Sequence, residues 1–287
     1  MVVEQSVLVT GGTGTLGRAV VQRLLDAAPA GARLTDGRPA VRVLSRRSRS
    51  AADDRPYDWA TGDLRSGEGI DAAVTGADVV IHCATTLGRG DVEATRRLTD
   101  AVARQPDGSP HLVHISIVGI DRIPLGYYRA KLEAERIIES SQVPWTILRA
   151  TQFHDLIARI ASAQRRLPAL AALAGVRFQP VDVTEVAARL VELADGFPAG
   201  RVPDLGGPEA RAHTDLTRAW LRATGRRRAV LPLPLPGRAG RELRAGANLV
   251  VAGEDGGNTL GRITFEDFLA GRRPTGRNPE RGQTGGE

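Results

Sequence analysis

Lysine is almost absent from this chain of 287 residues, because its 39 lysine and arginine side chains include a single lysine, Lys131. Arginine therefore meets the general need for positive charge. The lysine ammonium is a compact point charge on a flexible stem, whereas the arginine guanidinium is flat and forked. A lone lysine in such a chain indicates a specific contact that arginine cannot make.

Cysteine and long apolar runs are scarce as well. Cys83 is the single cysteine, so the chain can form no internal disulfide and gives no sign of an oxidising compartment. The longest apolar run, 167–176, has ten residues and is too short to span a bilayer. The first residues include Glu4 in place of a basic region and do not resemble a signal peptide. We therefore expect a cytoplasmic protein with no membrane partner.

Aromatic residues make up only 4% of the chain, which leaves few platforms on which nucleic-acid bases could stack. The net charge of +6 and the pI of about 10.5 would suit a nucleic-acid partner if the arginines were clustered. They are mostly scattered among acidic residues, with short runs at 46–47, 226–228 and 272–273. We therefore predict no nucleic-acid partner and ascribe the charge to the use of arginine in place of lysine.

Short apolar runs alternate with segments of helical periodicity over residues 1–150. Runs that are apolar at nearly every position suit strands covered on both faces. The alternation predicts an α/β fold of the Rossmann type, with a doubly wound parallel sheet. Strands are expected at 6–10, 41–44, near 59, 79–83, 111–117 and 145–148. Helices are expected at 15–28, 91–104 and 128–140.

The pattern is looser after Thr151. It predicts a helix to about Ala174, a strand near 177–181, a helix at 184–194, and loops or edge strands at 203–208 and 231–236. Residues 271–287 are rich in Gly, Arg, Pro and Thr without an apolar face, and are predicted to be a disordered tail. We expect residues 1–270 to form one domain, with a core at about 1–150 and a small variable lobe at 151–270 interleaved with it.

A glycine-rich loop, VTGGTGTLG at residues 9–17, lies between the first predicted strand and the first predicted helix. Glycine at this place lets the backbone turn tightly and approach a pyrophosphate. The phosphate charge then meets free N–H groups and the positive end of the helix dipole. We therefore predict dinucleotide binding by this loop. The residues involved would be Gly11, Thr13, Gly14, Thr15, Leu16 and Gly17.

The end of the second strand indicates which dinucleotide is bound, because an acidic residue there favours NAD and a basic residue accommodates the 2′-phosphate of NADP. Here the strand ends in Ser45, Arg46 and Arg47 without a carboxylate. Arg46 can place two donors on one phosphate. Asp36 is acidic, but it lies in a Thr-Asp-Gly turn before the strand and is interpreted as a turn residue. The predicted cofactor is NADP(H).

The chain resembles the short-chain dehydrogenase/reductase superfamily from Val7 to about Leu193 and, within it, the atypical NmrA-like group of NAD(P)-binding proteins. The resemblance is carried by TGGTGTLG (10–17), GDL (62–64), YYRAK (127–131) and WTILRATQFHD (145–155). It implies that Asp63 and Leu64 flank the adenine. It also implies that Cys83, Ala84 and Thr85 line the ribose and nicotinamide side, with Ala150 near the nicotinamide. The candidates for the substrate pocket are Thr86, Gln152, Phe153 and His154.

Catalytically competent members of the superfamily carry a tyrosine four residues before a lysine, and Tyr127 and Lys131 have this spacing. Residues four apart share one face of a helix, so both side chains can point into one cleft. Reduction of a ketone forms an alkoxide that must receive a proton, and an ordinary phenol with a pKa of about 10 is a poor partner. We therefore expect the Lys131 ammonium to lower the pKa of Tyr127 and to hold the cofactor ribose.

The third catalytic residue departs from the pattern of the superfamily. Competent members carry a serine at the end of the fifth strand, and the matching position here is Ile117, with Ser116 one residue earlier. Because adjacent residues of a strand face opposite ways, Ser116 can serve only if the strand has already ended there. The Ser116, Tyr127 and Lys131 site is therefore either assembled with unusual geometry or incomplete.

The resemblance implies an NADPH-dependent oxidoreductase of the ketoreductase type. Its substrate would be the carbonyl of a ketone or quinone, or a conjugated double bond, in a small apolar molecule such as a secondary metabolite. Two alternatives stay open, namely a non-catalytic NmrA-like regulator that senses NADP(H) and a nucleotide-sugar epimerase or dehydratase. No metal site is expected, and the sequence leaves the substrate and the oligomeric state open.

Overall fold

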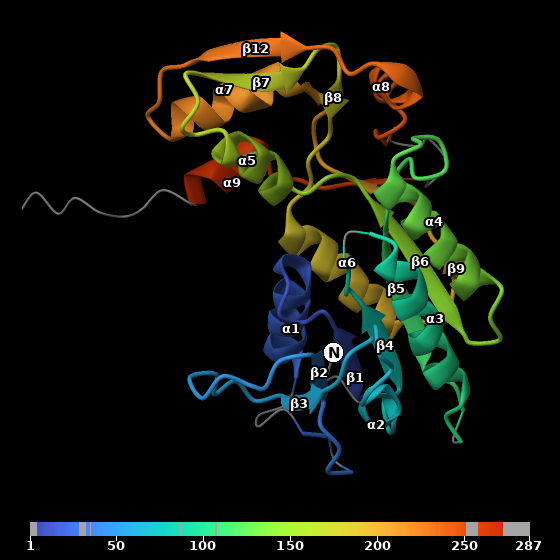
Figure 1. The fold of residues 1–287 in the computed structure, drawn as a ribbon. Coiled ribbons are helices and arrows are strands. Elements are labelled where there is room, and N and C mark those ends of the chain that lie inside the picture. The colour runs from blue at the N-terminus through green and yellow to red at the C-terminus, as the bar shows by residue number, and fades with distance from the viewer. Residues whose placement is uncertain are drawn as a thin grey trace, which may run out of the picture.

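The computed structural model of the protein describes residues 5–28, 33–34, 36–86, 88–106, 108–250 and 258–271. A parallel sheet with helices on both faces forms its lower part in Figure 1, and a smaller group of strands and helices lies above it. The described strands of the large sheet follow the order β13-β10-β6-β5-β4-β1-β2-β3, with β9 joined to β6. The predicted fold of the Rossmann type is confirmed.

Six strands of the large sheet agree with the predicted ones to within about two residues. They are β1 (Val7–Thr10), β2 (Val41–Ser45), β3 (Asp58–Thr61), β4 (Val79–His82), β5 (His111–Ile117) and β6 (Trp145–Ala150). Three short strands from the second half of the chain extend the sheet beyond β6. They are β9 (Gly200–Arg201), β10 (Leu205–Gly206) and β13 (Thr259–Leu260). The second half of the chain therefore contributes to the same sheet as the first.

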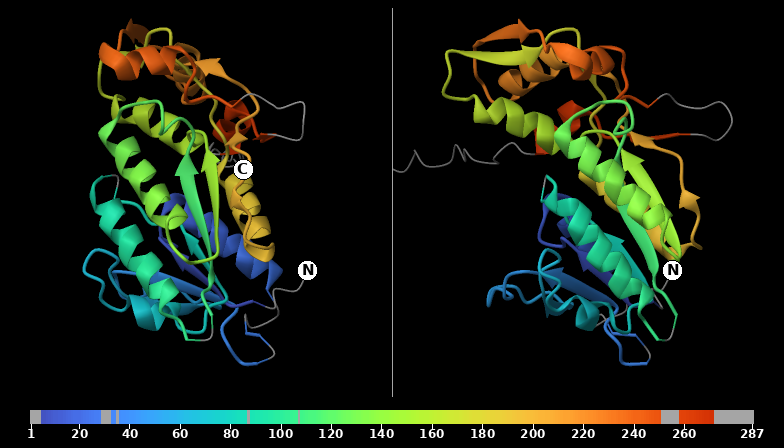
Figure 2. Two further views of the ribbon diagram at one scale, coloured as in Figure 1. Left: turned by 90° about the vertical axis from the view of Figure 1, so that its right-hand side faces the viewer. Right: turned by 45° about the vertical axis from the view of Figure 1, so that its right-hand side comes forward.

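The helices form two layers on the sheet. One layer consists of α1 (Thr15–Ala27) and α6 (Val183–Asp195). The opposite layer consists of α2 (Ile70–Val74), α3 (Gly90–Ala103) and α4 (Gly126–Glu139). Figure 2 shows the two layers on either side of the strands. The two layers bury the central strands of the sheet, such as β1 and β4, on both faces, which explains why these strands are apolar at nearly every position. The outer strand β3 is only half-buried.

The upper lobe contains four helices and two strand pairs among the described residues. The helices are α5 (His154–Ala163), α7 (His213–Ala223), α8 (Gly237–Arg244) and α9 (Phe265–Gly271). The strand pairs are β7 (Ala169–Leu173) with β12 (Ala229–Leu233), and β8 (Arg177–Phe178) with β11 (Arg211–Ala212). The sequence analysis did not predict α7, α8 or α9. No described helix has the length and apolar character needed to cross a bilayer.

The helix predicted to reach Ala174 ends at Ala163, which corrects that expectation. Pro168 explains the difference, because it lacks an N–H group and drives the preceding residue towards an extended conformation. The next residues alternate between half-buried and buried positions and form β7. The stretch 231–236 was expected to be a loop or an edge, and β12 is an edge strand that contains Pro232. The predicted tail lies outside the described residues, apart from Gly271, which ends α9.

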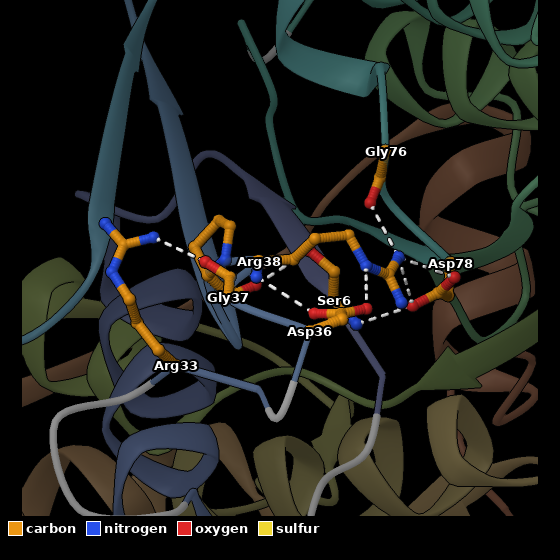
Figure 3. A network of polar contacts seen from close by, with 8 residues as sticks. Ser6, Arg33, Asp36, Gly37, Arg38, Gly76 and Asp78 are labelled. Carbon is orange, nitrogen blue, oxygen red and sulfur yellow. Dashed lines mark hydrogen bonds and ion pairs between the residues drawn. The ribbon is translucent and has the colours of Figure 1, made fainter.

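Asp36 lies at the edge of the sheet where β1, β2 and β4 begin, as Figure 3 shows. Its carboxylate accepts hydrogen bonds from the Arg38 backbone N–H at 2.9 Å and from Arg38 Nε at 2.6 Å. These hydrogen bonds hold the pKa of Asp36 below its usual value. Arg38 also forms an ion pair with Asp78 at 3.0 Å. Asp36 is therefore a turn residue, as its sequence context indicates.

Two histidines lie side by side inside the sheet. His82 of β4 pairs in register with His114 of β5, and their ring centroids are 5.0 Å apart. His82 Nδ1 forms a 2.7 Å hydrogen bond with Thr10 Oγ1. Burial, reinforced by the charge of Lys131, lowers the pKa of His82 to about 3 and holds that of His114 well below its usual value. Both rings are therefore neutral in the folded protein.

We predict that acid destabilises the fold through these histidines. Their folded pKa values lie below the unfolded value of 6.5, so the unfolded state binds more protons once the pH falls below 6.5. The loss is up to about 1.4 kcal/mol per pH unit for each histidine. Denaturant unfolding should show that wild-type stability falls from about pH 7 to about pH 5 more steeply than that of His114→Phe, which keeps an aromatic ring. Equal slopes in the two proteins would contradict this account.

Candidate cofactor and active site

A cleft of about 310 Å³ opens at the carboxyl ends of β1 to β4. In a doubly wound sheet, ligands bind at this edge, where the strand order reverses between β4 and β1. Four loops, the end of β2 and α3 contribute the lining residues, which are Gly11, Thr13, Gly14, Leu44, Ser45, Arg46, Arg47, Gly62, Asp63, Leu64, Arg65, Cys83, Ala84, Thr85, Thr86, Asp91 and Ala94. Most of the predicted cofactor-binding residues therefore lie around one space.

The glycine loop needs glycine at two positions for different reasons. Gly11 has φ of +70°, and a Cβ atom there would lie 2.6 Å from the Ala84 backbone nitrogen. A Cβ atom on Gly17 would collide with the Gly11 carbonyl oxygen, so Gly17 lets α1 pack against the loop. Leu16 is buried in the core, and neither Leu16 nor Gly17 lines the cleft. These two predicted residues therefore support the packing of the loop and do not face the cleft.

The first turn of α1 has the features of an anion site. Its N-cap, Gly14, provides no side-chain cap, and the turn contains no acidic residue. The free N–H groups and the positive end of the helix dipole are therefore open to a negative group. Thr13 and Thr15 are exposed beside them. A dinucleotide pyrophosphate fits this cradle, which a larger side chain at Gly11 would distort.

Basic side chains surround the far end of the cleft, where the adenosine half of a dinucleotide would lie. Arg46 and Arg47 follow β2 and are exposed, and Arg65 faces the same space from the loop after β3. Asp63 shapes that loop, because its Oδ1 accepts a hydrogen bond from the Arg65 N–H at 2.8 Å. The sequence analysis missed Leu44, Gly62 and Arg65, which directly adjoin predicted residues. This end of the cleft fits a phosphate-bearing ribose.

Lys131 of α4 is buried with Asp91 of α3. Its Nζ lies 3.9 Å from Asp91 Oδ2, and the two side chains are only 5% and 3% exposed. Burial lowers the pKa of Lys131, and the charge of Asp91 opposes that shift most strongly. Asp91 was not among the predicted site residues, because its only signal in the sequence is its place near the start of a helix. Asp91 is the counter-ion of the lone lysine.

Asp91 also holds the loop that follows β4. Its Oδ1 accepts hydrogen bonds from the Thr86 N–H at 2.5 Å and from the Thr86 hydroxyl at 2.7 Å. Its Oδ2 accepts the Thr85 hydroxyl at 2.6 Å. The Thr85 oxygen lies 3.2 Å from the Tyr127 hydroxyl. One carboxylate therefore connects the wall of the cleft with both predicted catalytic residues of α4.

The pKa of Tyr127 is raised, which is opposite to the expected lowering. Burial is the largest cause and the charge of Asp91 adds to it, whereas the hydrogen bond with Thr85 opposes both. Lys131 forms its ion pair with Asp91 and not with the phenol. Tyr127 is therefore a neutral phenol at physiological pH. Cys83, on the floor of the cleft, is likewise protonated, because burial raises the pKa of its thiol to about 12.

Ser116 lies inside β5, which continues to Ile117. The strand has therefore not ended at Ser116, which was the condition for its catalytic use. Its side chain is 2% exposed, and its Oγ has no hydrogen-bond partner within the described part of the chain. Neither Ser116 nor Ile117 lines the cleft. Tyr127 and Lys131 do not line the cleft themselves, but they contact Thr85 and Asp91, which do. Ser116 is placed in neither way.

The predicted substrate residues do not lie together. Thr86 lines the cleft, bound to Asp91. Gln152 is buried and accepts a hydrogen bond from Asn248 Nδ2 at 3.4 Å. His154 is buried under α9, where its ring stacks on Phe268 at 5.2 Å and its Nε2 lies 3.0 Å from the Ile263 carbonyl oxygen.

Ala150 and Phe153 pack in the apolar core between the sheet and the layer of α1 and α6. Together with Gln152 and His154, they connect β6 to the lobe and do not line the cleft.

A buried ion pair fixes α4 to the sheet. Arg149 of β6 donates to Glu135 of α4 through Nε at 2.8 Å and through Nη2 at 2.5 Å. Arg149 also lies 3.4 Å from Asp121. Glu135 follows Lys131 by four residues, so the two share one face of the helix. The forked pair therefore sets the position of the helix that carries Tyr127 and Lys131.

Comparison with known proteins agrees with a nucleotide-cofactor site. The sequence profile of a family described as NAD(P)H-binding matches residues 11–193, from the glycine loop to α6. The chain is 30% identical over 225 residues to the (4-alkanoyl-5-oxo-2,5-dihydrofuran-3-yl)methyl phosphate reductase of Streptomyces griseus. That match covers 77% of this chain and 74% of the relative.

Two solved structures share the architecture, including the upper lobe. The NADPH-dependent quinone oxidoreductase of Escherichia coli, complexed with NADPH, has a TM-score of 0.74 at 17% identity, covering 92% of this chain and 99% of that one. The triphenylmethane reductase of Citrobacter sp., complexed with NADP(H), has a TM-score of 0.72 at 17% identity, covering 93% of this chain and 99% of that one. At this identity the likeness establishes the fold.

We predict that Asp91→Asn makes cofactor binding weaker and dependent on pH. Without its counter-ion the buried Lys131 has a still lower pKa and loses its proton as the pH rises. Fluorescence titration with NADPH should show an affinity about tenfold below wild type, declining further towards high pH. Asp100→Asn, an exposed change on the same helix, is the matched control. Unchanged affinity across the pH range in Asp91→Asn would refute the role of the pair.

Proposed function

We propose, from the premise that the chain belongs to the NAD(P)H-binding family of atypical short-chain dehydrogenases/reductases, that it is an NADPH-dependent reductase of conjugated carbonyl compounds. Its substrate would be a small, mainly apolar enone or quinone. The observation that carries the proposal is the neutral phenol of Tyr127, linked to Asp91 through Thr85 and without a serine partner in the cleft.

The proton-donating groups of the site suit a weakly basic product. The bound reduced nicotinamide would supply a hydride. Hydride addition to an isolated ketone leaves an alkoxide, a strong base that needs several donors for stabilisation. Addition to a conjugated carbonyl leaves an enolate or a hydroquinone anion, whose charge is spread over several atoms. A hydroquinone is itself a phenol, with a pKa near the value of about 10 for tyrosine. One neutral tyrosine is therefore an adequate donor.

Tyr127, Thr85 and Lys131 each have a separate part in this proposal. Tyr127 would give its hydroxyl proton to the substrate anion and recover a proton from solvent. Thr85 would orient the phenol, because its own hydroxyl proton is already donated to Asp91. Lys131, held by Asp91, would donate to the ribose hydroxyls.

The name of the Streptomyces griseus relative supports the substrate class. A 4-alkanoyl-5-oxo-2,5-dihydrofuran has a ring double bond conjugated with two carbonyl groups, and that protein is described as its reductase. A second candidate function, a non-catalytic sensor of NADP(H), is favoured by one observation. Ser116 is enclosed within β5, and the usual serine position is occupied by Ile117.

We predict that the protein oxidises NADPH with cyclohexenone or a quinone at least about a hundredfold faster than with cyclohexanone. The absorbance of the reduced cofactor measures the rates. Tyr127→Phe should lower kcat with the conjugated substrates by about a hundredfold, whereas Tyr128→Phe, in the adjacent buried position, should lower it much less. Equal rates with the two cyclic ketones would refute the substrate class. Tight NADPH binding with no turnover on any acceptor would favour the sensor.

We propose that Arg46 selects NADPH over NADH by contacting the 2′-phosphate. Arg46→Ala should raise the Kd for NADPH by about tenfold and leave the Kd for NADH nearly unchanged, because NADH lacks that phosphate. Calorimetric titration with both cofactors measures the two values. Arg47→Ala is the control at the neighbouring position of the same cleft. A parallel loss of affinity for both cofactors in Arg46→Ala would contradict the assignment.

A further inference from the structure

The outer face of the β7–β12 pair is apolar and uncovered. The strands pair in parallel, with Leu231 opposite Ala171 and Leu233 opposite Leu173. Leu170, one position along, is fully buried in the core cluster that includes residues of α7. Because strand residues alternate between faces, the opposite side of the pair carries only apolar side chains. The exposed part of this outer face consists of Ala229, Leu231 and Leu233. Ala169, Ala171 and Leu173 complete it at half-buried positions, and Leu173 also packs against the core cluster.

The exposure of this face is unusual for a sheet in water. Leu231 and Leu233 are each 50% exposed, and Ala229 on the same face of β12 is exposed as well. A sheet with one side in solvent normally carries polar residues there. Uninterrupted exposed apolar residues therefore mark a contact surface. Figures 1 and 2 show that the pair lies at the end of the molecule away from β3 and α2.

Exposed arginines flank both ends of the outer face. Arg226 donates to the Arg165 carbonyl at 3.1 Å and Arg228 to the Leu167 carbonyl at 2.7 Å. These hydrogen bonds connect the segment that precedes β12 with the segment that precedes β7. These bonds to neutral carbonyls leave the positive charges uncompensated. At one end lie Arg165, Arg166, Arg226, Arg227 and Arg228, and at the other, on α8, lie Arg238, Arg241 and Arg244.

None of these eight arginines takes part in an ion pair within the described ranges. The nearby Glu242 of α8 lies instead 3.9 Å from Arg122. The charge of this end of the molecule is therefore open to an external anion.

The edges of the pair are closed to an added strand. The Gln164 side chain accepts from the Ala171 N–H at 2.8 Å and donates to the Ala171 carbonyl at 3.2 Å, which occupies the free edge of β7. Pro232 and Pro234 have no N–H groups, so the edge of β12 cannot continue a ladder. A partner must therefore lie on the face and not along an edge.

A second copy of the chain is a poor occupant. Both ends of the outer face are positive, so packing two copies face to face brings arginine against arginine in either orientation. A broad negative surface with an apolar interior matches the pattern. We propose that the outer face is a peripheral docking surface for an anionic phospholipid bilayer, with Leu231 and Leu233 entering the headgroup boundary and the flanking arginines contacting lipid phosphates. This contact requires no membrane-spanning segment. It is an alternative to the expectation of no membrane partner.

Vesicle sedimentation tests the proposal with the full-length protein. Wild type should sediment with vesicles of phosphatidylglycerol and phosphatidylcholine and not with phosphatidylcholine alone, and added salt should weaken the binding. Arg226→Ser/Arg227→Ser/Arg228→Ser should bind the anionic vesicles on the order of a hundredfold more weakly. Leu231→Ser/Leu233→Ser should also bind more weakly, while its residual binding stays sensitive to salt.

The matched control is Arg96→Ser/Arg129→Ser/Arg136→Ser, which removes the same charge from exposed positions of α3 and α4. It should retain most of the binding. An equal loss in this control would mean that net charge alone drives the contact and would overturn the proposal. Absence of wild-type binding to anionic vesicles would also overturn it. The same holds if wild type forms a dimer that does not bind vesicles and Leu231→Ser/Leu233→Ser converts that dimer to a monomer. NADPH titration of each variant verifies folding and is independent of substrate turnover.

Discussion

Two opposite charges lie 3.9 Å apart with almost no access to water, on Asp91 of α3 and Lys131 of α4. Either charge alone would be costly to bury, so each residue requires the other. The same carboxylate binds Thr85 and Thr86, which form the wall of the cleft, and Thr85 contacts Tyr127. A single buried pair therefore aligns two helices, the loop after β4 and the phenol. Removal of either partner would affect all of them together.

The parts of the fold that follow from short-range patterns could be predicted from the sequence. The central strands β1 and β4 are apolar at successive positions because helices cover both faces, and such runs are easily recognised. The glycine loop was predictable for a similar reason, since Gly11 must accommodate a positive φ and a close approach to Ala84. By contrast, Ala169–Leu173 is a strand whose residues alternate between half-buried and buried positions, but its sequence predicted the end of a helix. Its conformation depends on β12, about sixty residues later in the chain.

The site was harder to predict, because its charges are paired by tertiary contacts. Tyr127 and Lys131 were found from their spacing, but the charge that acts on Tyr127 comes from Asp91 on another helix. Spacing along one helix carries no information about that neighbour. His154 shows the opposite case. The family resemblance implied a place in the substrate pocket, but α9, from a distant part of the chain, buries it against Phe268. Segments distant in the sequence therefore determine both the charges that act on the site and which residues line it.

The burial of Lys131 explains why arginine does not occupy this position. A guanidinium carries five N–H donors in a rigid plane, and each would need an acceptor once buried. Around Lys131 the charged acceptor within ion-pair distance is Asp91, and the neutral rings of His82 and His114 lie close enough for its charge to depress their pKa values. Arginine is accommodated inside this protein at Arg149, where Glu135 and Asp121 supply matching carboxylates. A compact ammonium can be buried with one carboxylate, which Asp91 supplies.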